Sequence, residues 1–133
     1  MRIVLTAAVA MFVVQLSAQP PSPFRLEETT IAQIQSAFRD RSLTCRSLVE
    51  RYLARIEAHD KRGAALNAIV MTNPDALKTA DDLDRRFRQS GAVGALHCVP
   101  VLVKDNYETV DMPTTAGSLS LKGMMTGADA FVV

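Results

Sequence analysis

Hydrophobic residues recur at helical spacing in three stretches of the chain, and each stretch begins with a helix start signal. Thr30 opens a capping-box pattern (TIAQ) ahead of a helix predicted over 31–41. Thr44 is the expected N-cap of a second helix, and Pro74 stands at the first position of a third helix that ends at Gly91. The apolar stripes are Ile31, Ile34 and Phe38; Leu48, Val49, Tyr52, Leu53 and Ile56; and Ala76, Leu77, Ala80, Leu83 and Phe87. We expect these stripes to face a core and the charged residues between them to be solvated.

Two short apolar runs predict strands. Residues 66–71 (LNAIVM) and 99–103 (VPVLV) are nearly continuous in hydrophobicity, which is typical of buried parallel strands. The order helix, helix, strand, helix, strand is the opening of an α/β fold. Residues 129–133 read as the start of a further helix. A sheet that stopped there would keep an open edge, so we expect the chain to be the N-terminal piece of a longer protein.

Lys104 directly follows the second predicted strand and precedes Asp105 and Asn106. In open α/β sheets, ligands bind at the carboxyl ends of the strands, so Lys104 is a candidate site residue. One interpretation is a surface lysine whose stem lies on apolar residues. The other is a lysine in a dry pocket, where desolvation favours the neutral amine and makes it a base. Asp105 and Asn106 are expected to close the turn through side-chain hydrogen bonds to the backbone.

The sequence around Lys104 resembles the amidase signature family, whose members hydrolyse or transfer amides. The matching motifs are Gly94, Leu96, His97 and Pro100; then Val103, Lys104, Asp105 and Asn106; then Thr114, Thr115, Ala116, Gly117 and Ser118. The resemblance covers 31–133 and implies the N-terminal helices and first strands of the family's mixed α/β sheet. It implies that Lys104 is the catalytic base, relaying a proton through a serine in a cis peptide bond to a serine nucleophile. It also implies a small-molecule or peptide amide substrate and no cofactor.

Other residues of these motifs have structural interpretations. His97, just before the predicted strand, is read as structural rather than as a second base. For Thr114, Thr115 and Ser118, capping of backbone groups is preferred over lining the site.

The chain departs from the family pattern at three points. Ala95 replaces a proline and Cys98 replaces a glycine, and both changes are expected to loosen or crowd the entry to the strand. The family's Gly/Ser-rich segment, which carries both serines, lies downstream of the threonine motif, and neither Ser118 nor Ser120 has that context. We therefore expect this chain alone to be inactive.

Two other functions compete with amide hydrolysis. The altered motif positions favour a truncated or degenerate amidase-like binding module without catalysis. The A subunit of a glutamyl-tRNA amidotransferase is a further alternative within the family, and the N-terminal targeting segment argues against it.

Residues 1–18 predict a secretory signal peptide. Arg2 supplies the positive end, residues 3–14 are apolar apart from one threonine, and small residues precede Gln19. An uncleaved anchor is the alternative. Residues 19–30 then form a proline-rich lead-in, and 31–133 form the amidase-like part. The protein is expected to be exported to the periplasm or secreted.

The composition and net charge argue against some classes of binding partner. The 133 residues are 48% hydrophobic and 22% charged, which is ordinary for a globular chain. A net charge of +1, no tryptophan and 5% aromatic residues argue against nucleic acid and against an anionic membrane surface. Export permits a disulfide, but Cys45 and Cys98 are far apart in sequence, so we expect two free cysteines, with pairing as the alternative. The two cysteines and two histidines show no metal-ligand spacing, so no metal site is expected.

Overall fold

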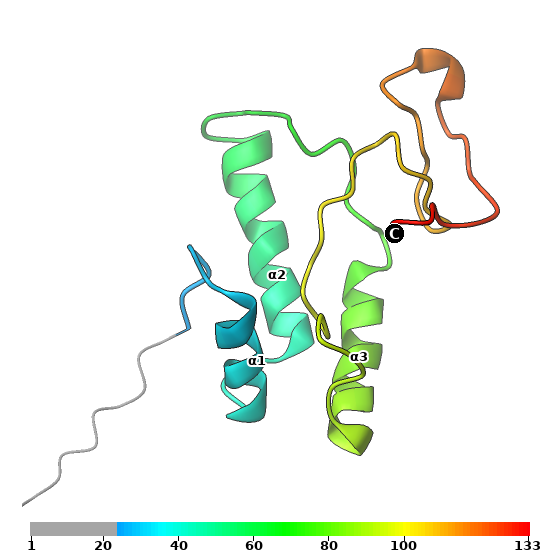
Figure 1. Ribbon diagram of the computed structural model, residues 1–133. Helices are drawn as coiled ribbons and strands as arrows, with labels where there is room; N and C mark the ends of the chain where they lie inside the picture. Colours follow the sequence, from blue (N-terminus) through cyan, green and yellow to red (C-terminus); the bar gives the residue numbers. More distant parts are fainter. Residues whose placement is uncertain (1–23) are drawn as a thin grey trace, which may run out of the picture.

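Three α-helices form the framework of the part of the chain that the computed structural model describes, residues 24–133 (Figure 1). They are α1 (Ile31–Arg39), α2 (Cys45–Arg55) and α3 (Ala76–Ser90). A π-helical turn, η1 (Ile56–Lys61), continues α2, and a short 3₁₀ helix, η2 (Leu119–Leu121), lies in the C-terminal loops. The predicted signal peptide and residues 19–23 of the lead-in lie outside the described residues.

Local capping sets where α1 and α2 begin, as predicted. The Thr30 hydroxyl accepts the Gln33 N–H at 3.2 Å, and the Gln33 side chain accepts the Thr30 N–H at 2.8 Å. Thr44 and Ser47 form the same reciprocal pair at the start of α2. These bonds satisfy backbone donors that the first helical turn leaves without partners.

Two predicted boundaries were wrong by two residues. The first helix stops at Arg39 because Arg41 has a φ of +57°, in the left-handed region. The third begins at Ala76 rather than at Pro74, because the Asn73 side chain accepts the Asp75 N–H and forms a turn first. Its end at Gly91 is confirmed: the glycine has a φ of +79° and donates to the Phe87 carbonyl.

The core lies where the three helices meet residues 97–98. Phe38 of α1 and Phe87 of α3 lie with ring centroids 6.1 Å apart, and Leu48 of α2 is fully buried. The buried apolar residues are Ile34, Ala37, Phe38, Leu43, Cys45, Leu48, Ala80 and Cys98. Four of these eight, Ile34, Phe38, Leu48 and Ala80, belong to the predicted helical stripes. The chain then runs from residue 98 as an extended segment between α2 and α3 (Figure 1).

Neither predicted strand forms within residues 24–133. The segments 66–71 and 99–103 have no regular strand structure, and side chains such as Val101 (74% exposed) and Leu102 (78%) face solvent. A strand exists only where a neighbouring strand accepts and donates its backbone hydrogen bonds, and these two segments do not pair with each other. Near residue 68 the donors go elsewhere: the buried Asp60 carboxylate accepts the N–H groups of Ala68 and Ile69.

The predicted helix start at 129–133 is also absent. The Asp129 carboxylate accepts the Val110 N–H at 2.9 Å, so it bonds to a neighbouring loop and does not cap a first helical turn. Residues 105–133 form loops around η2. Across residues 24–133, no helix combines the length and the apolar character that crossing a membrane requires.

Candidate functional site

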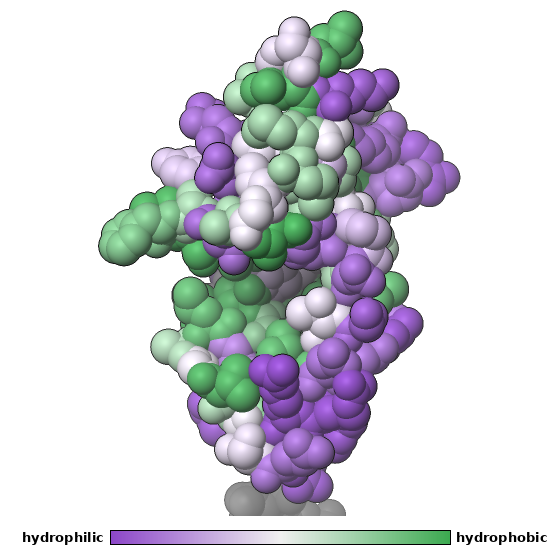
Figure 2. Space-filling view, turned by 90° about the vertical axis from the view of Figure 1, so that its right-hand side faces the viewer, coloured by the Kyte–Doolittle hydropathy of each residue, from purple (hydrophilic) through white to green (hydrophobic). Residues whose placement is uncertain are grey.

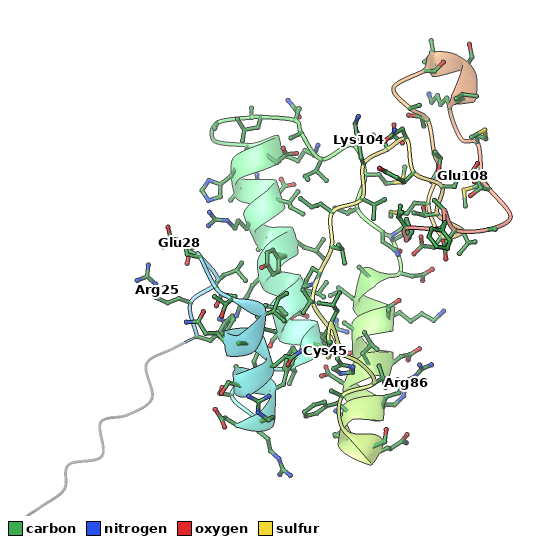
Figure 3. The ribbon with its side chains drawn as sticks, viewed as in Figure 1. Arg25, Glu28, Cys45, Arg86, Lys104 and Glu108 are labelled. Carbon is green, nitrogen blue, oxygen red and sulfur yellow. A yellow bond between two sulfur atoms is a disulfide. The ribbon has the colours of Figure 1, made fainter. Side chains whose placement is uncertain are left out.

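Lys104 lies at the end of the extended segment, on the surface (Figure 3). Its carbonyl accepts the Tyr107 N–H at 2.9 Å, which closes a turn directly after it. Its side chain is exposed, so within the described residues the structure matches the surface interpretation of Lys104 and not the dry pocket. Any desolvation of this amine requires atoms beyond those of residues 24–133.

Asp105 joins the lysine motif to the threonine motif. Its carboxylate accepts the Thr115 N–H at 2.9 Å, the Thr115 hydroxyl, and the Gly117 N–H at 3.2 Å. Its carbonyl accepts the Ala116 N–H. Thr115 accordingly holds the pKa of Asp105 below its usual value, since its hydroxyl and amide both bond to the ionised carboxylate. The two sequence motifs therefore form one structural unit.

The expected closure of the turn by the Asp105 side chain was wrong. Its carboxylate bonds to backbone groups ten to twelve residues further on, and the Lys104 carbonyl and the Tyr107 N–H close the turn instead. No hydrogen bond or ion pair in residues 24–133 joins the Lys104 ammonium to Asp105 or Asn106. Thr114 donates its hydroxyl to the Tyr107 carbonyl, so it and Thr115 bond to neighbouring loop groups, as the capping interpretation expects.

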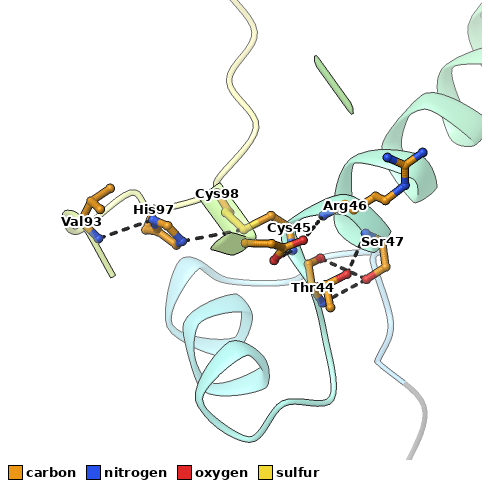
Figure 4. The surroundings of a disulfide bond; sticks show 8 residues. Thr44, Cys45, Arg46, Ser47, Val93, His97 and Cys98 are labelled. Carbon is orange, nitrogen blue, oxygen red and sulfur yellow. Dashed lines mark hydrogen bonds between the residues drawn. A yellow bond between two sulfur atoms is a disulfide. The ribbon is translucent and has the colours of Figure 1, made fainter. Parts of the chain in front are cut away.

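The expectation of two free cysteines was wrong, because Cys45 and Cys98 form a disulfide (Figure 4). They are 53 residues apart in sequence, but their Cα atoms lie only 5.3 Å apart. Packing of α2 against α3 brings the first residue of α2 to the loop that follows α3. The disulfide thus ties the segment leading to Lys104 to the start of α2.

His97 lies in the core beside this disulfide. Its ring stacks on Phe87 with centroids 5.5 Å apart and meets Phe38 edge-on at 6.3 Å. Burial lowers its pKa, and the nearby Asp84 carboxylate opposes that shift. Its position matches the structural interpretation and not that of a second base.

Asp84 has a role that its sequence pattern did not reveal. It is one of the charged residues of the third predicted helix, which were expected to be solvated. Instead its carboxylate accepts the N–H groups of Cys45 (2.8 Å) and Arg46 (3.1 Å) at the start of α2. A carboxylate is favourable at this positive end of the helix. The sequence signal for this role was that Asp84 lies four residues after Ala80 and so on the same side of the helix as the apolar stripe.

A pocket of about 320 Å³ lies between α2, α3 and residues 98–101, and it does not include Lys104. Figure 2 shows apolar residues bordering a hollow on one face of the molecule. The pocket is lined by Cys45, Val49, Asn73, Ala76, Thr79, Ala80, Leu83, Cys98, Val99, Pro100, Val101 and Asp111. Beside it, the fold also brings together three residues with metal-ligating atoms, Cys45, His97 and Cys98, which sequence spacing had not grouped.

Comparison with known proteins agrees with the motifs. The sequence model of the amidase family matches residues 47–133. Over 115 residues the chain is 44% identical to a protein of Arabidopsis thaliana named a probable amidase, a match that covers 84% of this chain and 22% of that protein.

Solved amidases share the fold of the described residues. The native peptide amidase from Stenotrophomonas maltophilia is 41% identical, with a TM-score of 0.72 over 74% of this chain and 20% of that one. An amidase family protein from Bacillus anthracis is 36% identical, with a TM-score of 0.75 over 80% of this chain and 21% of that one. The chain spans about a fifth of the length of these relatives. On the family match, the sequence identity and the shared fold, this chain belongs to the amidase family.

Proposed function

We propose that this chain is the N-terminal part of an exported amide hydrolase, in which Lys104 is the general base. The observation that carries the proposal is the joining of the two signature motifs through Asp105, directly after the residue that the family resemblance makes the base. Family membership supports hydrolysis of carboxylic amides. The short span relative to the relatives supports a longer protein, as do the exposed apolar segments 66–71 and 99–103.

The reaction is acyl transfer. A serine hydroxyl attacks the amide carbonyl, ammonia or an amine leaves, and water hydrolyses the acyl-enzyme. Lys104 accepts the serine proton through a second serine and returns it to the leaving nitrogen. This role needs a neutral amine, which desolvation favours. Lys104 is exposed in residues 24–133, so the chain alone is expected to be inactive.

The test uses the full-length protein and a simple carboxylic amide, with ammonia release as the readout. Lys104→Ala should lower kcat by about 100- to 10,000-fold, the contribution of a positioned acid–base group. Lys122→Ala is the matched control, since Lys122 is also an exposed loop lysine, and it should keep wild-type activity. Comparable activity of the two variants would exclude Lys104 as the base.

A polypeptide of residues 19–133 tests the inactivity claim. It should release no ammonia, and hydrolysis that Lys104→Ala abolishes would overturn the claim. The intact mass of the mature protein from its source cells separates the hydrolase from a non-catalytic binding module. A mass several-fold above that of residues 19–133 supports the hydrolase, and a mass that matches residues 19–133 supports the module.

Export is part of the proposal. Disulfides form and persist in oxidising compartments, so the Cys45–Cys98 bond supports a periplasmic or secreted protein. The signal peptide proposed for 1–18 makes the mature chain begin at Gln19, which N-terminal sequencing checks.

A further inference from the structure

Three buried side chains with metal-binding atoms meet at the start of α2 (Figure 4). Cys45, His97 and Cys98 are 1%, 4% and 8% exposed, and their ligand atoms all lie within 4.8 Å of one another. The Cys45 Sγ and His97 Nε2 atoms are 3.7 Å apart. In a tetrahedral zinc site, Zn–S of about 2.3 Å and Zn–N of about 2.0 Å give a sulfur–nitrogen separation of roughly 3.5 Å. The separation of these two atoms is therefore close to that of two ligands that share one metal ion.

We propose that, when the disulfide is reduced, Cys45, Cys98 and His97 bind one Zn²⁺ ion. A dithiol reductant supplies two electrons and two protons to the S–S bond, which becomes two thiols while the reductant becomes a cyclic disulfide. Zinc then displaces both thiol protons and binds two thiolates and the Nε2 lone pair. The two thiolate charges balance the charge of the ion, so the buried site is neutral overall.

Backbone movement is small in this exchange. The two cysteine Cα atoms are 5.3 Å apart, and a tetrahedral zinc ion needs their sulfurs to separate to roughly 3.8 Å. Rotation of the two side chains about their Cα–Cβ bonds is enough to open that space. Zinc would thus replace the disulfide as the link between α2 and the segment that follows residue 98.

Zinc binding requires the loss of one hydrogen bond of His97. The His97 Nδ1 atom accepts the Val93 N–H at 3.4 Å, so in the oxidised chain the ring proton sits on Nε2 and faces the Cys45 sulfur. Zinc binding at Nε2 moves this proton to Nδ1 and ends the bond from Val93. Val93 is exposed, so its amide can turn to water. The loss of one long, neutral hydrogen bond is small beside the free energy of a structural zinc site.

The three side chains leave one position of a tetrahedral site unfilled, and a pocket adjoins the cluster. Cys45 and Cys98 both line the pocket between α2 and α3, which has room for a water molecule as the fourth ligand. Asp84 lies close by, but its two oxygens already accept the amides of Cys45 and Arg46, so it is not a ligand. The site is thus built of three protein ligands and one solvent position. It does not depend on amide hydrolysis.

The experiment titrates the full chain with Co²⁺ as a spectroscopic probe and Zn²⁺ as the competitor. The chain is reduced with a phosphine and handled without oxygen. The reduced chain should bind one equivalent of Co²⁺ with thiolate-to-cobalt charge-transfer absorption, and Zn²⁺ should displace it, whereas the oxidised chain should show no such absorption. His97→Gln should weaken binding by at least about tenfold. His59→Gln is the control, because His59 is the exposed histidine of η1 and lies outside the cluster.

Several results would overturn the proposal. They are equal metal binding by the oxidised and reduced chains, equal effects of His97→Gln and His59→Gln, and no binding by a reduced chain whose helical circular dichroism is intact. If reduction unfolds the chain, zinc should restore the helical signal in the wild type and fail to do so in His97→Gln. A wild-type chain that stays unfolded with zinc would also contradict the site.

Discussion

The disulfide between Cys45 and Cys98 should contribute a large part of the stability of this chain. It closes a loop between residues 53 apart in sequence and so restricts the unfolded chain strongly. The loop-closure entropy for that length is worth about 4 kcal/mol at 25 °C. Small domains have a total free energy of unfolding of about 5–15 kcal/mol, so the loss of this one bond is expected to be a large fraction of it.

The perturbation is the double substitution Cys45→Ala with Cys98→Ala. A second double variant, Cys45→Ala with Cys98→Gly, lacks the disulfide too but relieves the backbone at residue 98, where φ is +59°. A residue with a Cβ is disfavoured there by about 1–2 kcal/mol, and glycine loses about 0.4–1 kcal/mol through the entropy of the unfolded chain. The glycine variant should therefore be more stable than the alanine variant by up to about 1.6 kcal/mol.

Urea unfolding of the full chain, followed by far-ultraviolet circular dichroism, measures both differences. The alanine variant should unfold at a clearly lower urea midpoint than the oxidised wild type. Reductant should lower the midpoint of the wild type and leave both double variants unchanged. The reasoning fails if the oxidised wild type and the alanine variant share one midpoint, because the disulfide would then contribute nothing to the stability of the fold.

Three further predictions test other contacts. Burial lowers the pKa of His97 in the folded chain. Its contribution to stability should therefore be full above the ordinary histidine pKa of about 6.5 and should decrease as the pH falls from there towards the lower pKa of the folded state. The His97→Gln variant should lose that part of the pH dependence of the urea midpoint. Asp105→Asn should speed amide hydrogen exchange at Thr115 without changing exchange in α1–α3, and unchanged exchange at Thr115 would contradict the role of the Asp105 carboxylate in holding the second motif. Leu48→Ala should cost about 2–5 kcal/mol of unfolding free energy because Leu48 is fully buried, whereas Leu119→Ala, at an exposed position, should change it by less than about 0.5 kcal/mol; equal losses would refute the core assignment.

The helices could be predicted from the sequence because their determinants are local. The hydrogen bonds that begin α1 join Thr30 and Gln33, and the hydrogen bond that ends α3 joins Gly91 and Phe87. The boundaries that were wrong, at Arg41 and Pro74, depend on one backbone angle and one side-chain turn that composition does not specify. Local signals therefore predicted the presence of α1, α2 and α3 better than their exact boundaries.

The two strands could not be established from the sequence for a different reason. The apolar pattern at 99–103 reports a preference for burial, but a strand also needs a partner for its backbone groups. Residues 24–133 supply no such partner, so the segment is extended and its side chains are exposed. The apolar pattern predicts that the segment needs burial and a partner strand. Whether it obtains them depends on residues far away in sequence.

The candidate site also has a part that the sequence indicated and a part that depends on the packing of distant segments. The resemblance of 103–106 and 114–118 to family motifs drew attention to Lys104 and Asp105, and the carboxylate of Asp105 does hold the second motif. The pairing of Cys45 with Cys98 had no local signal, because it follows from the packing of α2 on α3. The role of Asp84 followed from the same packing.

The two departures from the family motif bear on whether this part of the chain has degenerated. Ala95 and Cys98 were expected to loosen or crowd the entry to the segment that ends at Lys104. Instead, the Ala95 carbonyl accepts a hydrogen bond from the Gln35 side chain, and Cys98 is covalently tied to α2. Residue 98 has the left-handed φ that favours the family's glycine, and a cysteine there incurs a conformational cost that its disulfide outweighs by the magnitudes given above. Both altered positions therefore hold the segment that ends at Lys104 against the helices, and this part of the chain shows no loosening at the altered motif.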